Sequence, residues 1–183
     1  MRTMTDIPEL VTERLVLRGM TKADFPAFVA VWQEPEVVRY IGAKPRPEAE
    51  SWGVFLRIAG SWALDGYGQW AITRRTDGRF LGQCGFFRAM RGLGADFDEV
   101  PEAGWALTTD AHAQGFGREA VSAAHAWFDA QPFGGSSVAM IEVGHAGSFA
   151  VAKRLGYRPL REVEDMGDPV TLLRRDVVPG NRD

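Results

Sequence analysis

Hydrophobic and polar positions follow strand and helix periods in turn along the first third of the chain. From 14 to 18 charged and apolar residues alternate, which predicts a half-buried strand. Thr21 and Asp24 resemble a capping box in which Asp replaces Glu, and they predict a helix that continues through Trp32. Apolar residues then recur at helical spacing over 48–63, so we expect a second helix there with a buried face.

The middle of the chain has the pattern of a hairpin followed by a loop and another strand. Strand patterns at 69–74 and 80–88 flank a turn at 76–79, which predicts an antiparallel pair. A glycine-rich segment over 90–101 predicts a mobile loop, and a strand is expected at 102–108.

Helix and strand patterns alternate in the last third. Helical spacing over 116–129 predicts an amphipathic helix, and the apolar run 137–143 predicts a buried strand. A shorter helix is expected over 148–155, and the segments 157–163 and 169–175 are plausible final strands.

The order of these elements predicts an α/β (α+β) fold in a single domain over 1–183, because no linker divides the chain. We expect a mixed sheet of six or seven strands flanked by about four helices. The hairpin makes the first half antiparallel, whereas the strands 102–108 and 137–143, joined through a helix, are expected to be parallel.

Composition narrows the class of protein. A net charge of −3 gives no basis for nucleic-acid binding, and no apolar run is long enough for a membrane span. The beginning of the chain lacks the apolar segment of a secretion signal, so we expect a cytoplasmic protein. Cys84 is the single cysteine, which excludes an internal disulfide and a cysteine-based metal cluster, and we expect no metal.

The segment from Ala113 to Ala120 has the sequence AQGFGREA and joins a predicted strand to a predicted helix. Gly115 and Gly117 leave free backbone N–H groups at the helix start, where anions bind. A Walker loop needs Gly-Lys-Ser/Thr, and a dinucleotide fingerprint needs a third glycine near Ala120, so neither fits. Phosphate binding is the first hypothesis, and plain chain reversal is the alternative.

Three blocks together resemble the GNAT superfamily of acyl-CoA-dependent N-acetyltransferases, and more narrowly its branch of ribosomal-protein N-terminal acetyltransferases. The first is LVTERLVLR at 10–18, and the second is GWAL at 104–107 followed by the loop at 113–120. The third runs from His145 to Tyr157 and contains HAGS and KRLGY. They span almost the whole chain in the order of that family.

The resemblance implies that an amine attacks the thioester of acetyl-CoA directly while both are bound. The pantetheine arm would lie between the strands 102–108 and 137–143, which separate there, and the N–H near Leu107 would polarise the thioester carbonyl. It implies the following cofactor-binding residues: Leu107, Thr108, Gln114, Gly115, Phe116, Gly117, Arg118, His145 and Ser148.

The same resemblance suggests catalytic residues. Glu102, at the start of a strand beside the thioester, is the candidate general base, and acids of the loop 90–101 are alternatives. Ser148 matches a serine that protonates the departing thiolate or contacts pantetheine, and it can also be read as a helix N-cap. His112 and His145 stand where the family usually has Gln or Arg and Asn, so His145 replaces only part of the amide's hydrogen bonding.

The acceptor is expected to be a primary amine, either the α-amine of a peptide or a small amino compound. Neutralising an alkylamine of pKa near 10.4 at pH 7 costs roughly 4–5 kcal/mol, but an α-amine costs only about 1 kcal/mol. A site without an obvious strong base therefore favours the α-amine. A catalytically lapsed acyl-CoA sensor, a larger acyl donor and a homodimer stay open.

Overall fold

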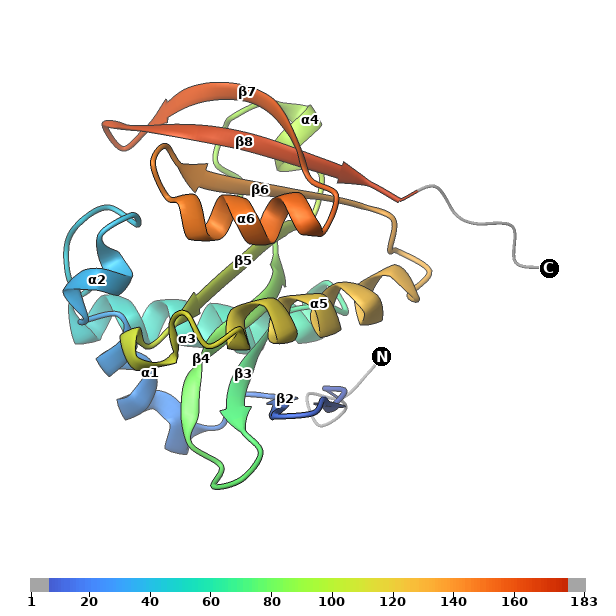
Figure 1. Cartoon of the computed structure of the whole chain (residues 1–183). Coiled ribbons are helices and arrows are strands. Elements are labelled where there is room, and N and C mark those ends of the chain that lie inside the picture. Colours follow the sequence, from blue (N-terminus) through green and yellow to red (C-terminus); the bar gives the residue numbers. More distant parts are fainter. Residues whose placement is uncertain (1–6, 178–183) are drawn as a thin grey trace.

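Eight strands form one mixed sheet in the computed structural model, which describes residues 7–177 (Figure 1). The two ends of the predicted domain, 1–6 and 178–183, lie outside the described residues. The strand order is β1-β2-β3-β4-β5-β6-β8-β7. The strands are β1 Leu10–Val11, β2 Leu15–Arg18, β3 Gln69–Arg74, β4 Phe80–Phe87, β5 Glu102–Leu107, β6 Ser136–Glu142, β7 Arg158–Asp165 and β8 Asp168–Asp176.

Helices cover both faces of the sheet, with α5 and α6 on the near face of Figure 1 and α3 behind it. Ala103 and Leu107 of β5 belong to the core beneath α5, whereas the intervening Ala106 packs with α1 and α3. No helix within residues 7–177 has the length and apolarity needed to cross a membrane. The helices are α1 Phe25–Val31, α2 Pro35–Val38, α3 Glu48–Leu64, α4 Ala95–Asp98, α5 Phe116–Asp129 and α6 Ala146–Arg154, with 3₁₀ turns η1 Lys22–Asp24 and η2 Thr109–Ala111.

The predicted α/β class and the parallel pairing of β5 with β6 are confirmed. The predicted numbers of strands and helices were too low. The additional strand, β1, has two residues, and α2 and α4 have four each, so none is long enough to show a period in the sequence. The helix α2 begins at Pro35, shortly after the first predicted helix was expected to end at Trp32, and α4 lies inside the expected loop over 90–101.

A buried chain of hydrogen bonds joins α5 to the second half of the sheet. The Nδ1–H of His125 donates to the carbonyl of Val121 at 2.8 Å, because a carbonyl can only accept. Its Nε2 therefore accepts from the hydroxyl of Tyr157 at 2.9 Å, and the Tyr157 oxygen lies 2.6 Å from Ser137 Oγ. This arrangement requires a neutral imidazole.

Protonation of His125 should make the free energy of unfolding depend on pH. Burial lowers the pKa of His125 from 6.5 to about 4. The unfolded chain then binds a proton near pH 6.5 that the folded chain takes up only near pH 4. The free energy of unfolding is therefore fully present above pH 6.5 and falls as the pH decreases from 6.5 to about 4. We expect a loss of about 2 kcal/mol between pH 7 and pH 5, measured by urea unfolding.

The variant His125→Gln has no proton to gain and is the matched control for this titration. Its free energy of unfolding should change less than that of the unmodified chain between the same two pH values. Equal changes in both proteins would contradict the assignment to His125.

Candidate active site

The strands β5 and β6 separate almost immediately after they meet. They pair only at Glu102 and Val138, where the Val138 N–H donates to the carbonyl of Pro101 at 2.9 Å. Just past the end of β5, the Thr108 N–H donates at 2.8 Å to the carbonyl of Leu81 in β4, on the side away from β6. Because N–H groups alternate along a strand, the Leu107 N–H faces the open side toward β6. The separation exposes a backbone donor in the middle of the sheet.

The loop between β5 and α5 presents a run of backbone N–H groups at the helix start. Gly115 has φ +80°, a left-handed conformation that suits glycine, and α5 begins at the next residue. Among the described residues, no hydrogen bond uses the backbone N–H of 114 to 118 as donor outside the helix ladder. Free N–H groups at a helix N-terminus attract anions and phosphate groups.

Arg14, the residue before β2, holds this loop in place. Its Nε donates to Glu119 Oε2 at 2.7 Å, and its Nη1 donates to the Gln114 carbonyl at 2.9 Å. The guanidinium also lies 4.5 Å from the centre of the Phe116 ring. Burial would raise the pKa of Glu119, but the hydrogen bonds from Thr12 and Arg14 outweigh it and hold the pKa below its ordinary value. Glu119 therefore stays ionised. The contacts of Arg14 with Glu119 and with the Gln114 carbonyl form a clamp on the loop, the Arg14 clamp.

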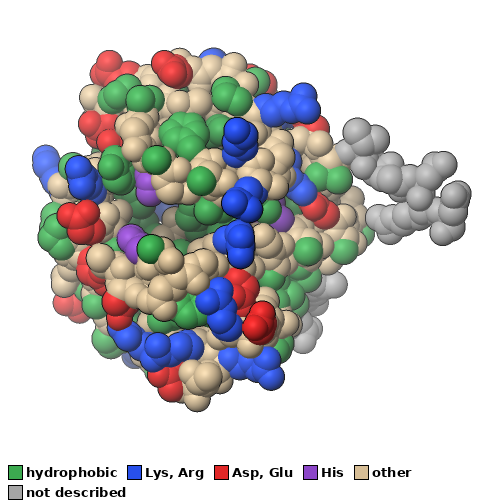
Figure 2. All heavy atoms as spheres, in the orientation of Figure 1, with side chains coloured by type: hydrophobic (Ala, Val, Ile, Leu, Met, Phe, Trp, Pro, Cys, Tyr) green, Lys and Arg blue, Asp and Glu red, His purple; other side chains and the backbone are tan. Residues whose placement is uncertain are grey.

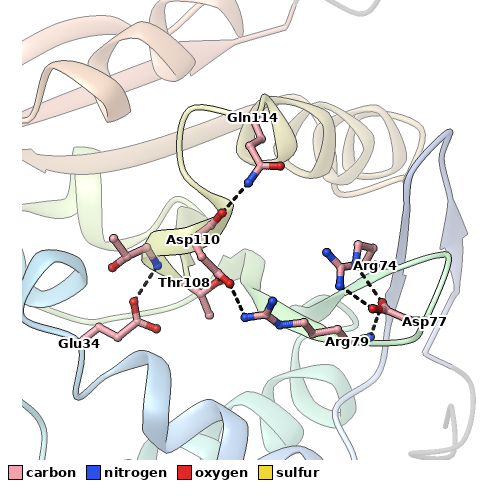
Figure 3. A network of polar contacts seen from close by, with 8 residues as sticks. Glu34, Arg74, Asp77, Arg79, Thr108, Asp110 and Gln114 are labelled. Atoms are coloured by element: carbon pink, nitrogen blue, oxygen red, sulfur yellow. Dashed lines mark hydrogen bonds and ion pairs between the residues drawn. The ribbon is translucent and has the colours of Figure 1, made fainter.

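A second network holds the loop from the opposite side, as Figure 3 shows. Asp110 accepts hydrogen bonds from the Thr108 hydroxyl at 2.7 Å and from Arg79. The Gln114 amide donates to the Asp110 carbonyl, and Glu34 accepts from the Thr109 N–H at 2.7 Å. The Gln114 side chain thus supports the loop from within, while its backbone N–H faces outward.

A cavity of about 670 Å³ lies between the sheet, α3, the segment 40–47 and the start of α6. Its volume falls in the usual range for small-molecule sites. Figure 2 shows the near face hollowed between α6 and the beginning of α5, with Lys and Arg side chains gathered beside the hollow. The lining includes Trp32, Tyr40, Arg46, Gln69, Gln83, Glu102, Trp105, Glu142, His145 and Ser148.

Ser148 and His145 form a hydrogen-bonded pair on the wall of this cavity. The Trp105 Nε1–H donates to Ser148 Oγ at 3.2 Å, and Ser148 Oγ lies 3.0 Å from His145 Nε2. Because the indole can only donate, the serine hydroxyl is free to donate to a neutral His145. Burial lowers the pKa of His145, with the charge of His112 acting in the same direction, and its ring stacks on Tyr40 at 4.4 Å.

The interpretation of Ser148 as a helix N-cap was wrong. The helix α6 begins at Ala146 and its N-cap is His145, so Ser148 is the third helical residue. The sequence placed the start of this helix two residues too late. In consequence the Ser148 hydroxyl serves the cavity, while Ala152 is fully buried one turn further on.

Glu102 lies in the cavity but is not free. It is 5% exposed, and Arg91 binds both of its carboxylate oxygens, with Nε to Oε2 and Nη2 to Oε1 at 2.9 Å each. The Arg91 Nη1 also lies 3.7 Å from Asp165 Oδ2. Both carboxylate oxygens of Glu102 are thus engaged in charge-assisted hydrogen bonds.

The structure distributes the residues singled out in the sequence over two places. Glu102, His145 and Ser148 line the cavity, whereas Gln114, Gly115 and Arg118 line a separate hollow on the outside of the loop. Sequence reasoning missed a second set, Arg14, Tyr40, Arg46 and Arg91, because their partners are distant in the chain. Within residues 7–177, no group of three or more His, Cys, Asp or Glu is arranged to hold a metal ion.

Comparison with known proteins relates this geometry to solved structures. A structure from Bordetella pertussis named as a GnaT-family acetyltransferase is 29% identical, covers 92% of this chain and 99% of its own, and superposes with a TM-score of 0.83. The Bacillus subtilis protein YkkB, which is uncharacterised, is 26% identical over 91% of this chain and 95% of its own length.

An enzyme of the ribosomal branch also shares the fold. The Salmonella typhimurium acetyl transferase that modifies the N-terminal serine of ribosomal protein L7/L12 has a TM-score of 0.74, covering 94% of this chain and 99% of its own. Its identity is only 15%, so it does not establish the branch. The model of the acetyltransferase (GNAT) domain matches residues 14–158. This match extends from the arginine of the loop clamp to the first residue of β7, and the chain therefore belongs to the GNAT acetyltransferase family.

Proposed function

We propose that this chain transfers an acetyl group from acetyl-CoA to the α-amine of a peptide or a small amino compound, with both molecules bound at once. One observation carries the proposal. The unbonded N–H groups of 114 to 118 lie at the end of the loop that leaves β5, the strand whose separation from β6 opens a slot lined by Trp105 and Ser148.

The residues present fit coenzyme A. The N–H groups of Gln114, Gly115, Phe116, Gly117 and Arg118 would hold its diphosphate, and the exposed Arg118 side chain adds a positive charge. A Cβ on Gly117 would touch only the end of Leu107 at 3.6 Å, so the position is open toward the loop's outer side. Thr108 fixes the entry to the loop through Asp110.

Acetyl-CoA supplies the acyl group as an activated thioester when bound. The Leu107 N–H, held by the strand, would donate to the thioester carbonyl as charge develops there. Such a donor needs no reorganisation during the reaction because the β4–β5 ladder fixes its direction. Donors of this kind contribute about 2.7–4 kcal/mol where they have been measured.

Ser148 would turn its O–H from His145 Nε2 toward the departing sulfur, give the thiolate its proton, and take a proton back from solvent. Its hydroxyl already receives a hydrogen bond from Trp105 and faces the neutral Nε2 of His145. In this arrangement His145 orients the hydroxyl, which is the part of the asparagine role that an imidazole can take. Tyr40 keeps the ring in position by stacking.

Glu102 would accept the proton of the amine through water while Arg91 stays bound to both of its carboxylate oxygens. We expect Glu102→Gln to lower turnover about tenfold near pH 7, with the loss shrinking at higher pH, where α-amines lose their own proton. The matched control is Asp165→Asn, which removes another cavity carboxylate facing Arg91. A pH–rate profile unchanged in Glu102→Gln would remove Glu102 from the mechanism.

Turnover tests the function as a whole. Free thiol release from acetyl-CoA should appear with α-amino compounds or N-terminal peptides and exceed the rate with spermidine. Peptides with ribosomal-protein N-termini test the narrower branch, and acyl-CoAs of increasing length test the donor. Saturable acetyl-CoA binding without thiol release from any amine would instead favour an acyl-CoA sensor.

A further inference from the structure

The cavity contains a cationic side chain that the acetyl transfer described above does not use. Arg46 lies between Pro45 and Pro47, in the segment that leads into α3, and its side chain lines the cavity. Its backbone N–H donates to the carbonyl of Trp32 at 3.1 Å, and its guanidinium lies 3.9 Å from the centre of the Trp32 ring. Two prolines, a backbone bond and an aromatic face therefore hold Arg46 in one position.

The Arg46 guanidinium has no acidic partner within the described part of the chain. Its Nη1 is buried and makes no hydrogen bond, and none of the ion pairs among residues 7–177 includes it. Burial lowers its pKa, as does the nearby charge of Arg57, while Glu50 acts in the opposite direction. Because Nη1 itself is shielded, a ligand in the cavity would meet the other N–H groups of this guanidinium, which also have no acceptor among residues 7–177. A partly buried cation without a partner is costly, so this position favours an anionic ligand.

The platform beneath Arg46 is itself fixed. The Trp32 Nε1–H donates to Gln83 Oε1 at 3.4 Å, and the Gln83 amide donates to Gln69 Oε1 at 3.0 Å. Both glutamines belong to the sheet and line the cavity. The guanidinium is thus presented by a rigid wall, which favours planar, bidentate recognition of an anion.

The charge distribution in the cavity matches an acceptor with two opposite charges. Glu142 at the end of β6 and Asp168 at the start of β8 line the cavity, and neither forms an ion pair with any residue of 7–177. Burial raises the pKa of Glu142, and Asp168 acts in the same direction, as expected for neighbouring carboxylates that lack a cation. The segments before and within α3 supply Lys44, Arg46 and Arg57 together with one acid, Glu50, whereas the charged residues that β6 and β8 supply to the cavity are acids alone.

We propose that the acceptor is a small amino acid or a related amino compound whose carboxylate or other anionic group binds Arg46, while its amine lies toward the acids of the sheet. This inference rests on the proposed acetyl transfer and adds the class of acceptor. The anion is not the diphosphate of the donor, because none of the residues that line this cavity belongs to the loop at 108–118.

Pairs of acceptors that differ by one charge test the proposal. Aspartate and asparagine, glutamate and glutamine, and alanine and alaninamide are compared by kcat/KM in the thiol-release assay. We expect the charged member of at least one pair to be favoured about ten- to hundredfold, the range for a charge-assisted hydrogen bond. In Arg46→Gln this ratio should approach one, and Arg46→Lys should restore part of it.

The matched control is Arg158→Gln, which removes the same charge from an exposed position on β7, and its ratio should equal that of the unmodified chain. Equal kcat/KM for charged and neutral acceptors in the unmodified chain would overturn the proposal and leave the acetyl transfer intact. A raised KM for acetyl-CoA in Arg46→Gln, with an unchanged kcat/KM ratio of charged to neutral acceptors, would also overturn the proposal. That result would mean that Arg46 binds an anionic group of the donor.

A binding measurement separates this proposal from the proposed function. N-acetylglutamate and N-acetylglutamine are titrated calorimetrically into the protein saturated with coenzyme A. Tighter binding of the glutamate form, lost in Arg46→Gln, would support the anion site even if no amine were acetylated. Equal binding of both compounds, together with equal kcat/KM for alanine and alaninamide, would count against it, because the second comparison covers an α-carboxylate at Arg46.

Discussion

Replacing Gly117 with valine should lower the affinity for coenzyme A at least a hundredfold while the chain still folds. Two or more charge-assisted hydrogen bonds to the diphosphate would be displaced, and each contributes about 1.5–3 kcal/mol. Within the protein the new Cβ would lie 3.6 Å from Leu107 Cδ1, an ordinary contact. The valine side chain should therefore displace the diphosphate without disturbing the protein. Calorimetric titration with acetyl-CoA measures the loss of affinity.

The control for this substitution is Ala126→Val, which places the same β-branched residue at an exposed position of α5. Both variants should unfold at similar urea concentrations, and only Gly117→Val should lose affinity. Gly115 is a weaker test, because its φ of +80° strains any side chain and would mix loop distortion with loss of binding. Unchanged affinity in Gly117→Val would place the diphosphate elsewhere.

Replacing Ser148 with alanine should lower kcat about a hundredfold, the lower end of the range for a positioned general acid. The KM for acetyl-CoA should change little, because the diphosphate is held at a separate place in the fold. Steady-state rates over a range of acetyl-CoA concentrations separate the two quantities. The opposite result, a raised KM with unchanged kcat, would make Ser148 a pantetheine contact.

Two further variants make the result specific. Ser148→Thr retains a hydroxyl that can accept from Trp105, and it should recover most of the lost kcat. Ser51→Ala removes another buried serine whose hydroxyl has no hydrogen-bond partner, and it should leave both quantities unchanged. An equal loss in Ser148→Ala and Ser148→Thr would point to packing around α6 instead of proton transfer.

Local sequence patterns predicted the long elements well. The bounds of β3 and α5 were predicted to the residue, because each follows a glycine-containing turn and α5 also has a strong helical period. The elements that were missed are short, such as β1, α2 and α4, and tertiary contacts form them where local pattern is weak. The start of α6 was misplaced because Ser is a common N-cap, while here His145 takes that position.

The candidate site was predictable only where one segment contains it. The loop at 113–120 could be recognised because its function depends on consecutive backbone groups. The pairing of Glu102 with Arg91 and the stacking of His145 on Tyr40 depend on side chains that meet through the fold. Sequence therefore made Glu102 the candidate base without showing the arginine that binds its carboxylate.

The Arg14 clamp has a consequence for the interpretation of related sequences. Arg14 and the Glu119 carboxylate that it binds are 105 residues apart, yet together they set the shape of the glycine loop. A homologue could retain both glycines and lack the arginine, and its short motif would look intact while the N–H groups no longer converged. Functional inference across this family should therefore weigh the motif together with the residue at position 14, not the glycines alone.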